Sequence, residues 1–141
     1  MRKVDELFLR YEESHRNPVN KTIHWICVPL ITWSVLAALW AAAPIIAYGA
    51  IALAVVFYLT LSLSIAIGML ALSVLMVAPL ALLGTHALIV AIVVFVLAWV
   101  GQFVGHAIEG KKPSFIDDLK FLLIGPAWLL HFVYRRIGIR Y

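Results

Sequence analysis

Charged side chains are scarce in this chain and are missing from most of its length. They make up 13% of the residues, about half of what a soluble domain carries. No Asp, Glu, Lys or Arg occurs between Lys21 and Glu109. One transmembrane helix needs about 20 apolar residues, so this stretch accommodates about four spans with tight turns. Because lipid offers no partners to backbone polar groups, the spans are expected to be helices. The sequence predicts an all-α integral membrane protein.

Other absences exclude whole classes of function. Cys27 is the only cysteine, which rules out an internal disulfide and a cysteine-based zinc site. The sequence contains no serine-hydrolase nucleophile elbow, P-loop, dinucleotide fingerprint or His-Glu-x-x-His motif. The net charge of +4 comes from flanks of mixed sign without an aromatic-basic patch, so nucleic acid is not an expected partner. Acidic residues precede the first apolar run, which is atypical of a cleavable signal peptide.

The N-terminal segment predicts a short amphipathic helix over residues 3–14. Its apolar side chains recur at i, i+3, i+4 and i+7, namely Val4, Leu7, Phe8 and Tyr11. This helix is expected to lie on the membrane or to pack on the helix bundle. Asn17 and Pro18 then favour a helix start, because Asn is a good N-cap and Pro suits the first helical position.

The apolar body divides into four predicted spans, at about 23–43, 45–67, 69–83 and 87–108. The internal breaks are placed at Gly68 and between Pro79 and Gly84. Residues 121–134 are apolar but short for a span, and Gly125-Pro126 interrupts them, which favours a re-entrant or interfacial segment. Ser114 or Asp117 is expected to cap that segment. The whole chain, 1–141, is interpreted as one membrane-embedded domain.

An even number of spans puts both basic flanks on one side of the membrane. The positive-inside rule makes that side cytoplasmic, in either a bacterial cytoplasmic membrane or an endoplasmic reticulum membrane. A non-spanning last segment keeps the basic tail, residues 135–140, on the same side. Both chain ends are therefore predicted to be cytoplasmic.

Two polar stretches, 15–24 and 102–109, meet at this cytoplasmic face in the predicted topology. Polar residues inside a membrane are costly and mark functional sites by default. Three histidines and a carboxylate are expected to converge there as metal ligands, namely His15, His24, His106 and Glu109. Such a set leaves open positions for substrate and oxygen on iron(II), or for water on zinc. Polar neighbours are expected to orient the imidazoles from behind, namely Asn17, Asn20, Gln102 and Asp117.

Three further features have a functional and a structural interpretation. His131 is either a fourth ligand or an interfacial residue, and the interfacial reading is favoured. His86 falls in a turn between spans and is interpreted as structural or solvent-facing. Gly101 and Gly105 form a Gly-x-x-x-Gly pair, which favours close packing inside the bundle over dimerisation. The oligomeric state is left open.

The two polar stretches also resemble the signatures of a known family. Tyr11-x-x-x-His15-x-Asn17-Pro18-x-Asn20-x-x-x-His24 resembles the opening signature of the Mpo1-like proteins, and Gln102-Phe-Val-Gly105-His106 followed by Glu109 resembles the second. The resemblance implies an iron(II)-dependent dioxygenase that converts a 2-hydroxy fatty acid and O2 to the fatty acid one carbon shorter. It assigns the catalytic ligand role to the matching residues His15, His24 and His106. His86 and His131 lie outside the signatures.

This resemblance implies a substrate whose acyl chain lies in the bilayer or between spans. Arg16 or Lys21 would steer the substrate carboxylate at the interface, although contact with lipid headgroups is the favoured explanation of both residues. Two other classes of function remain as alternatives. One is a haem protein with His24 and His106 as axial ligands, and the other is a small membrane scaffold or transporter.

Overall fold

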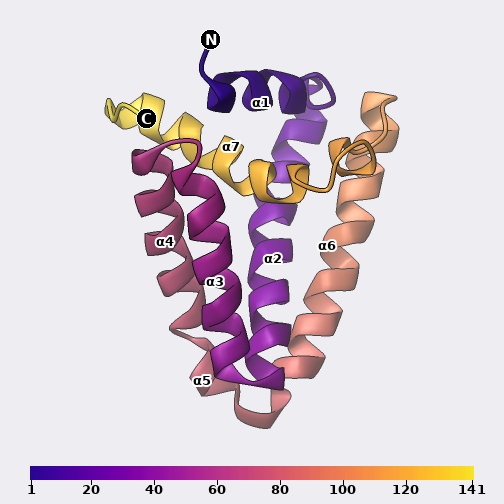
Figure 1. Cartoon of the computed structure of the whole chain (residues 1–141). Helices are drawn as coiled ribbons and strands as arrows, with labels where there is room; N and C mark the ends of the chain where they lie inside the picture. Colours follow the sequence, from indigo (N-terminus) through magenta and orange to yellow (C-terminus); the bar gives the residue numbers. More distant parts are fainter.

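The structure, a computed structural model that describes residues 1–141, consists of helices and turns without a β-strand. Four helices run alongside one another (Figure 1), namely α2 (Pro18–Ala42), α3 (Pro44–Leu59), α4 (Leu63–Val77) and α6 (Ala87–Glu109). Two more lie across one end of this bundle, namely α1 (Lys3–Glu12) and α7 (Phe121–Ile137). At the opposite end, α5 (Leu80–Leu83) and η1 (Gly84–His86) connect α4 to α6. The predicted all-α class is confirmed.

Two helical stretches, Pro18–Ala42 and Leu63–Glu109, are long and apolar enough to cross a membrane by length and composition. Helix α3 is apolar but shorter. The outward faces carry large aliphatic side chains, with Leu53 75%, Leu75 69% and Leu97 66% exposed. An exposed apolar surface of this kind is unfavourable in water and favourable in lipid. The fold is therefore compatible with a membrane protein.

The break between the second and third apolar runs lies earlier than the sequence predicts. Helix α3 ends at Leu59, and the Ser62 hydroxyl caps α4 by accepting a hydrogen bond from the Ile65 backbone N–H at 3.3 Å. Gly68, the predicted break, lies inside α4, where a Cβ would overlap the Tyr134 hydroxyl. Glycine at this position therefore permits close contact between α4 and α7 and does not end a helix.

Helix α1 packs on α7, and the buried residues are those that the amphipathic pattern predicts: Val4, Leu7, Phe8 and Tyr11. Helix α7 runs unbroken through Gly125-Pro126, which corrects the predicted interruption. Gly125 leaves room for the Tyr11 ring, since a Cβ there would lie 2.9 Å from the Tyr11 hydroxyl oxygen. Neither Ser114 nor Asp117 caps α7. The Lys120 backbone N–H, at the start of α7, donates instead to the Asp118 carboxylate at 3.1 Å.

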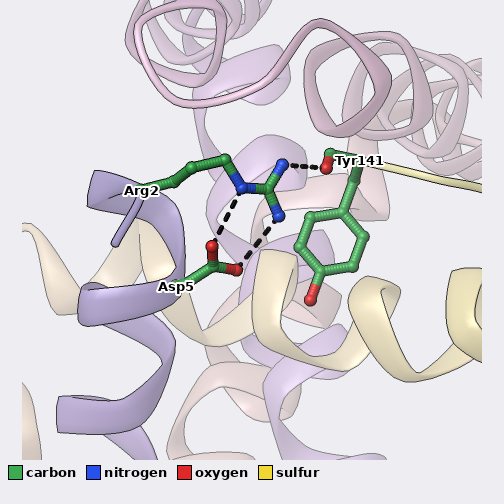
Figure 2. Close-up of polar contacts among 3 residues, drawn as sticks. All are labelled: Arg2, Asp5 and Tyr141. Carbon is green, nitrogen blue, oxygen red and sulfur yellow. Dashed lines mark hydrogen bonds and ion pairs between the residues drawn. The ribbon is translucent and has the colours of Figure 1, made fainter.

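Helices α1 and α7 are here called the outer layer. Contacts between the two ends of the chain hold this layer together (Figure 2). The Arg2 guanidinium pairs with the Asp5 carboxylate at 2.9 Å and also donates to the main-chain oxygen of Tyr141. It lies over the Tyr141 ring at 5.3 Å from the ring centre. These contacts fix the start of α1 against the segment that follows α7.

Helices α2 and α6 pack closely at the two glycines of the Gly-x-x-x-Gly pair. A Cβ at Gly101 would lie 2.6 Å from the Cys27 sulfur, and one at Gly105 would overlap the Asn20 side-chain oxygen. Packing inside the bundle, the favoured interpretation, is therefore confirmed. The predicted start of α2 is also confirmed, because the Asn17 side-chain oxygen accepts the Val19 backbone N–H at 2.9 Å. This packing brings the first turns of α2 beside the last turns of α6.

Candidate metal centre

Three imidazoles from three parts of the chain meet at the end of the bundle below α1. His15 lies in the turn between α1 and α2, His24 lies in α2, and His106 lies near the end of α6. Each ring offers one nitrogen, and these nitrogens all lie within 4.8 Å of one another. The side chains are buried, with 1%, 0% and 5% of their surface exposed. The structure thus brings together the three histidines that the sequence singled out.

Backbone carbonyl groups orient all three rings in the same way. The Nδ1 atom of His15 lies 2.6 Å from the Tyr11 carbonyl oxygen, and Nδ1 of His24 lies 2.9 Å from that of Asn20. Nδ1 of His106 lies 3.2 Å from the Lys111 carbonyl oxygen. A carbonyl oxygen only accepts hydrogen bonds, so each Nδ1 carries the hydrogen and each Nε2 keeps a free lone pair. Metal-ligating histidines in proteins characteristically have such a partner on the second nitrogen.

The inward nitrogens lack partners within the protein. Nε2 of His15 and Nε2 of His24 are buried and form no hydrogen bond. Leaving a buried polar atom unsatisfied costs about 1–3 kcal/mol, and two such atoms lie side by side here. A metal ion would satisfy both atoms and the Nε2 of His106 at once. The donor set therefore fits a metal ion.

The charge state of His15 also suits a metal ligand. Burial, followed by the proximity of His24, lowers the pKa of His15 to about 3. The imidazole is therefore neutral near pH 7, and its lone pair is available without the loss of a proton.

Aromatic and hydroxyl groups hold His15 in place, although His15 lies outside the long helices. The Tyr11 ring stacks on the imidazole with 4.0 Å between ring centres and 12° between planes. The neighbouring Ser14 hydroxyl forms a 2.6 Å hydrogen bond with the Ser114 hydroxyl in the loop before α7. Ser114 belongs to η2 (Ser114–Ile116), which sequence reasoning did not connect to the site. No local pattern signals this contact, because the two serines are 100 positions apart.

Glu109 lies outside the group of converging nitrogens, in contrast to the prediction that it ligates the metal. One carboxylate oxygen accepts the Arg16 backbone N–H at 2.8 Å. The other accepts the Asn17 backbone N–H at 2.7 Å and the Asn20 side-chain N–H at 3.3 Å. These donors belong to the start of α2, where backbone N–H groups have no helical partner. The carboxylate therefore fastens the end of α6 to the start of α2.

The predicted polar partners of the imidazoles have other roles in the structure. Asn17 caps α2, and the Asn20 side chain donates to the Ser14 carbonyl oxygen at 3.1 Å. Asp117 forms an exposed ion pair with Lys112 at 2.7 Å. Only Asn20 forms a hydrogen bond with a site histidine, and it does so through its backbone carbonyl. The predicted side-chain hydrogen bonds to the imidazoles do not form, because backbone carbonyl groups in α1, in α2 and in the loop after α6 already occupy the Nδ1 atoms.

The remaining polar residues that the sequence raised lie away from the histidines. Arg16 is exposed, and Lys21 lines a separate groove that it shares with Trp25 and Arg136, so neither lines the histidine cavity. His86 is exposed in η1, at the far end of the bundle, as predicted. His131 is buried and stacks on Phe8 with 4.8 Å between ring centres, outside the histidine group.

A cavity of about 40 Å³, here called the histidine cavity, lies beside the three imidazoles. Two further polar groups on α6 line it. The Gln102 side-chain oxygen and the Trp99 indole N–H are both buried without a hydrogen-bond partner. Gln102 was expected behind the imidazoles, and Trp99 was missed. Its signal was its spacing, because residues 99, 102 and 106 follow i, i+3 and i+7 on one helix face.

The family described as "2-hydroxy-palmitic acid dioxygenase Mpo1-like" matches residues 1–137 of the chain. No curated protein and no solved structure matches the chain. The matched region contains every helix and the three histidines of the candidate metal centre. Family membership therefore rests on nearly the whole chain.

Proposed function

We propose that this chain, which belongs to the Mpo1-like family, is an iron(II)-dependent dioxygenase of 2-hydroxy fatty acids. The reaction is R–CH(OH)–COOH + O2 → R–COOH + CO2 + H2O, which balances without an external reductant. One observation carries the proposal: three buried imidazoles direct unprotonated nitrogens at one point, and their other nitrogens are held by backbone carbonyls. The family description supports the substrate class.

His15, His24 and His106 would hold the iron through Nε2. When bound, iron(II) supplies the redox chemistry that activates O2 toward the substrate, and a three-histidine set leaves positions open for both reactants. The chain itself contributes orientation and shielding. The three carbonyl hydrogen bonds fix the ring orientations, and the Tyr11 and Trp128 rings cover His15 with centres 4.0 and 5.6 Å away.

Trp99 and Gln102 would bind the polar head of the substrate. The unpaired indole N–H is a donor for the carboxylate, and the Gln102 amide offers an acceptor for the 2-hydroxyl hydrogen. Both groups line the same cavity as the histidines. A 2-hydroxy acid would satisfy two buried groups that an unsubstituted fatty acid would satisfy only in part, which supports selectivity for the hydroxylated acid.

In the proposed membrane arrangement, α2, α3, α4 with α5, and α6 cross the bilayer. Helices α1 and α7 would lie at one interface as parts of the same domain, residues 1–141. All Lys and Arg residues fall at or before position 21 or after position 109, so this arrangement collects them on one side. The positive-inside rule makes that side, with the histidines, cytoplasmic in a bacterial membrane or an endoplasmic reticulum membrane.

The test is anaerobic metal analysis of the detergent-purified chain, followed by addition of 2-hydroxypalmitic acid and O2. We expect about one iron per chain and formation of the C15 acid, and loss of both in His24→Ala and His106→Ala. His86→Ala, which removes an exposed histidine far from the cavity, serves as the matched control. Full activity in either cavity variant would refute the metal assignment, and bound zinc without oxygen uptake would refute the dioxygenase.

The structure supports a haem protein less well than an iron site held by three histidines. Pockets that hold a molecule of drug size measure about 300–1,000 Å³, whereas the histidine cavity measures about 40 Å³. A Soret absorption band in the purified chain would nevertheless reverse this order of preference.

A further inference from the structure

We propose that the acyl chain of the substrate occupies a second cavity of about 240 Å³, lined by α2, α4 and α7 and here called the acyl chamber. This inference rests on the proposed function. The size of the histidine cavity limits what it can hold. One water needs about 10–15 Å³ of cavity volume, so the histidine cavity, at about 40 Å³, holds a metal and a small polar head. A long acyl chain has to extend beyond it.

The acyl chamber lies next to the histidine cavity. Thr32 of α2 and Pro126 of α7 line both the histidine cavity and the acyl chamber. The two cavities therefore adjoin at these two residues, here called the neck. A fatty acid with its head at the histidines would reach the chamber by passing this neck. Pro126 lacks the N–H that would bond the Leu122 carbonyl in the preceding turn, so α7 has one restraint fewer at this point.

The walls of the chamber differ in chemistry from those of the histidine cavity. The two hydroxyl side chains that line the chamber both donate to backbone carbonyl groups of their own helices. The Thr32 hydroxyl donates to the Val28 carbonyl oxygen at 2.9 Å, and the Ser73 hydroxyl donates to the Met69 carbonyl oxygen at 2.7 Å. No charged residue lines the chamber. Its walls thus suit hydrocarbon, in contrast to the unpaired donor and acceptor of the histidine cavity.

Two methionines, Met69 and Met76, line the α4 wall of the chamber. Methionine side chains are flexible and fill irregular space, so they adapt to an extended chain of variable conformation. A larger apolar groove, of about 550 Å³, lies between α3 and α4. It shares no residue with the histidine cavity. Connection to the head-group site, and not volume, therefore selects the acyl chamber.

The first test narrows the chamber with Ser73→Phe. We expect kcat/KM for 2-hydroxypalmitic acid to fall at least about tenfold, while kcat/KM for 2-hydroxyoctanoic acid changes less than about twofold and the iron content stays constant. Ala71→Phe is the matched control, because Ala71 lies two positions away on α4, is exposed and does not line the chamber. An unchanged ratio of the two kcat/KM values, which includes an equal loss for both acids, would overturn the proposal.

The second test does not depend on turnover. A 2-hydroxypalmitic acid with a photoreactive diazirine at its methyl end is bound anaerobically to the wild-type chain, irradiated and mapped by mass spectrometry. We expect labels on chamber residues such as Met69, Met76 and Leu130. Labels confined to the α3–α4 groove, or spread over the lipid-facing surface, would overturn the acyl chamber. If neither acid were turned over, the proposed function would fail and the labelling pattern would still locate the chain.

Discussion

Replacement of Glu109 by glutamine separates two roles that the sequence and the structure give to this residue. The sequence presents Glu109 as a candidate metal ligand, three positions after His106. In the structure its carboxylate accepts hydrogen bonds from Arg16 and Asn17, just before α2, and from Asn20 in its first turn. A ligand touches the metal, whereas a positioning residue only fixes the helices that carry the histidines. The two roles therefore predict different changes in the metal spectrum.

The hydrogen bonds set the size of the expected effect. The two carboxylate oxygens accept three N–H groups, at 2.8 Å from Arg16, 2.7 Å from Asn17 and 3.3 Å from Asn20. Glutamine keeps one oxygen and directs an NH2 group at one of the backbone donors. A hydrogen bond to a charged group is worth about 1.5–3 kcal/mol. Because Arg16 is exposed and water can replace its partner, we expect a loss near the lower end, about 2 kcal/mol of unfolding free energy.

The assay uses Co(II) in place of iron, because its visible absorption reports the ligands directly. For Glu109→Gln we expect an unchanged spectrum at saturation, with metal affinity about 10–100-fold weaker because the ligands are less well held. Glu13→Gln is the matched control, since Glu13 is an exposed carboxylate at the same end of the molecule. A changed Co(II) spectrum in Glu109→Gln alone would refute the positioning role and restore Glu109 as a ligand.

Three further variants test the packing and the cavity. Gly105→Ala places a methyl group onto the Asn20 side-chain oxygen, so we expect about 1–3 kcal/mol of destabilisation in thermal unfolding, and Gly49→Ala, which meets no neighbour, should lose nothing. Trp99→Phe keeps an aromatic ring and removes the unpaired indole N–H from the cavity, so KM for the 2-hydroxy acid should rise about tenfold or more with unchanged iron content. His131→Phe should retain iron and turnover, because His131 lies outside the histidine group; loss of iron would make it a ligand.

The sequence predicts well those features that depend on local pattern or on the strong constraint of lipid. The absence of charge between Lys21 and Glu109 determines the helical class. Asn17 and Pro18 locate the start of α2 because capping is a local interaction. The meeting of the histidines also follows from the sequence, since an even number of antiparallel helices returns the chain to the end at which it entered.

Features that depend on long-range packing could not be predicted from the sequence. Gly68 looks like a helix break, yet it serves a contact with Tyr134 on α7. Glu109 has the right chemistry for a metal ligand, and only the folded chain reveals that the unpaired N–H groups at the start of α2 reach it first. Trp99 lies on the same helix face as His106, but its cavity exists only when α2, α6 and the loop before α7 come together.

The position of His15 explains why the outer layer of helices belongs to the site. His24 and His106 lie on α2 and α6, which pack against each other directly, so a metal bound by these two alone would depend little on the rest of the chain. His15 lies in the turn after α1, and its place depends on Tyr11 stacking, on the Ser14–Ser114 hydrogen bond and on α1 packing against α7. A metal held by all three rings, as proposed, would therefore stabilise the docked outer layer through linkage, and this layer also lines the histidine cavity with Tyr11 of α1 and Phe121 of α7.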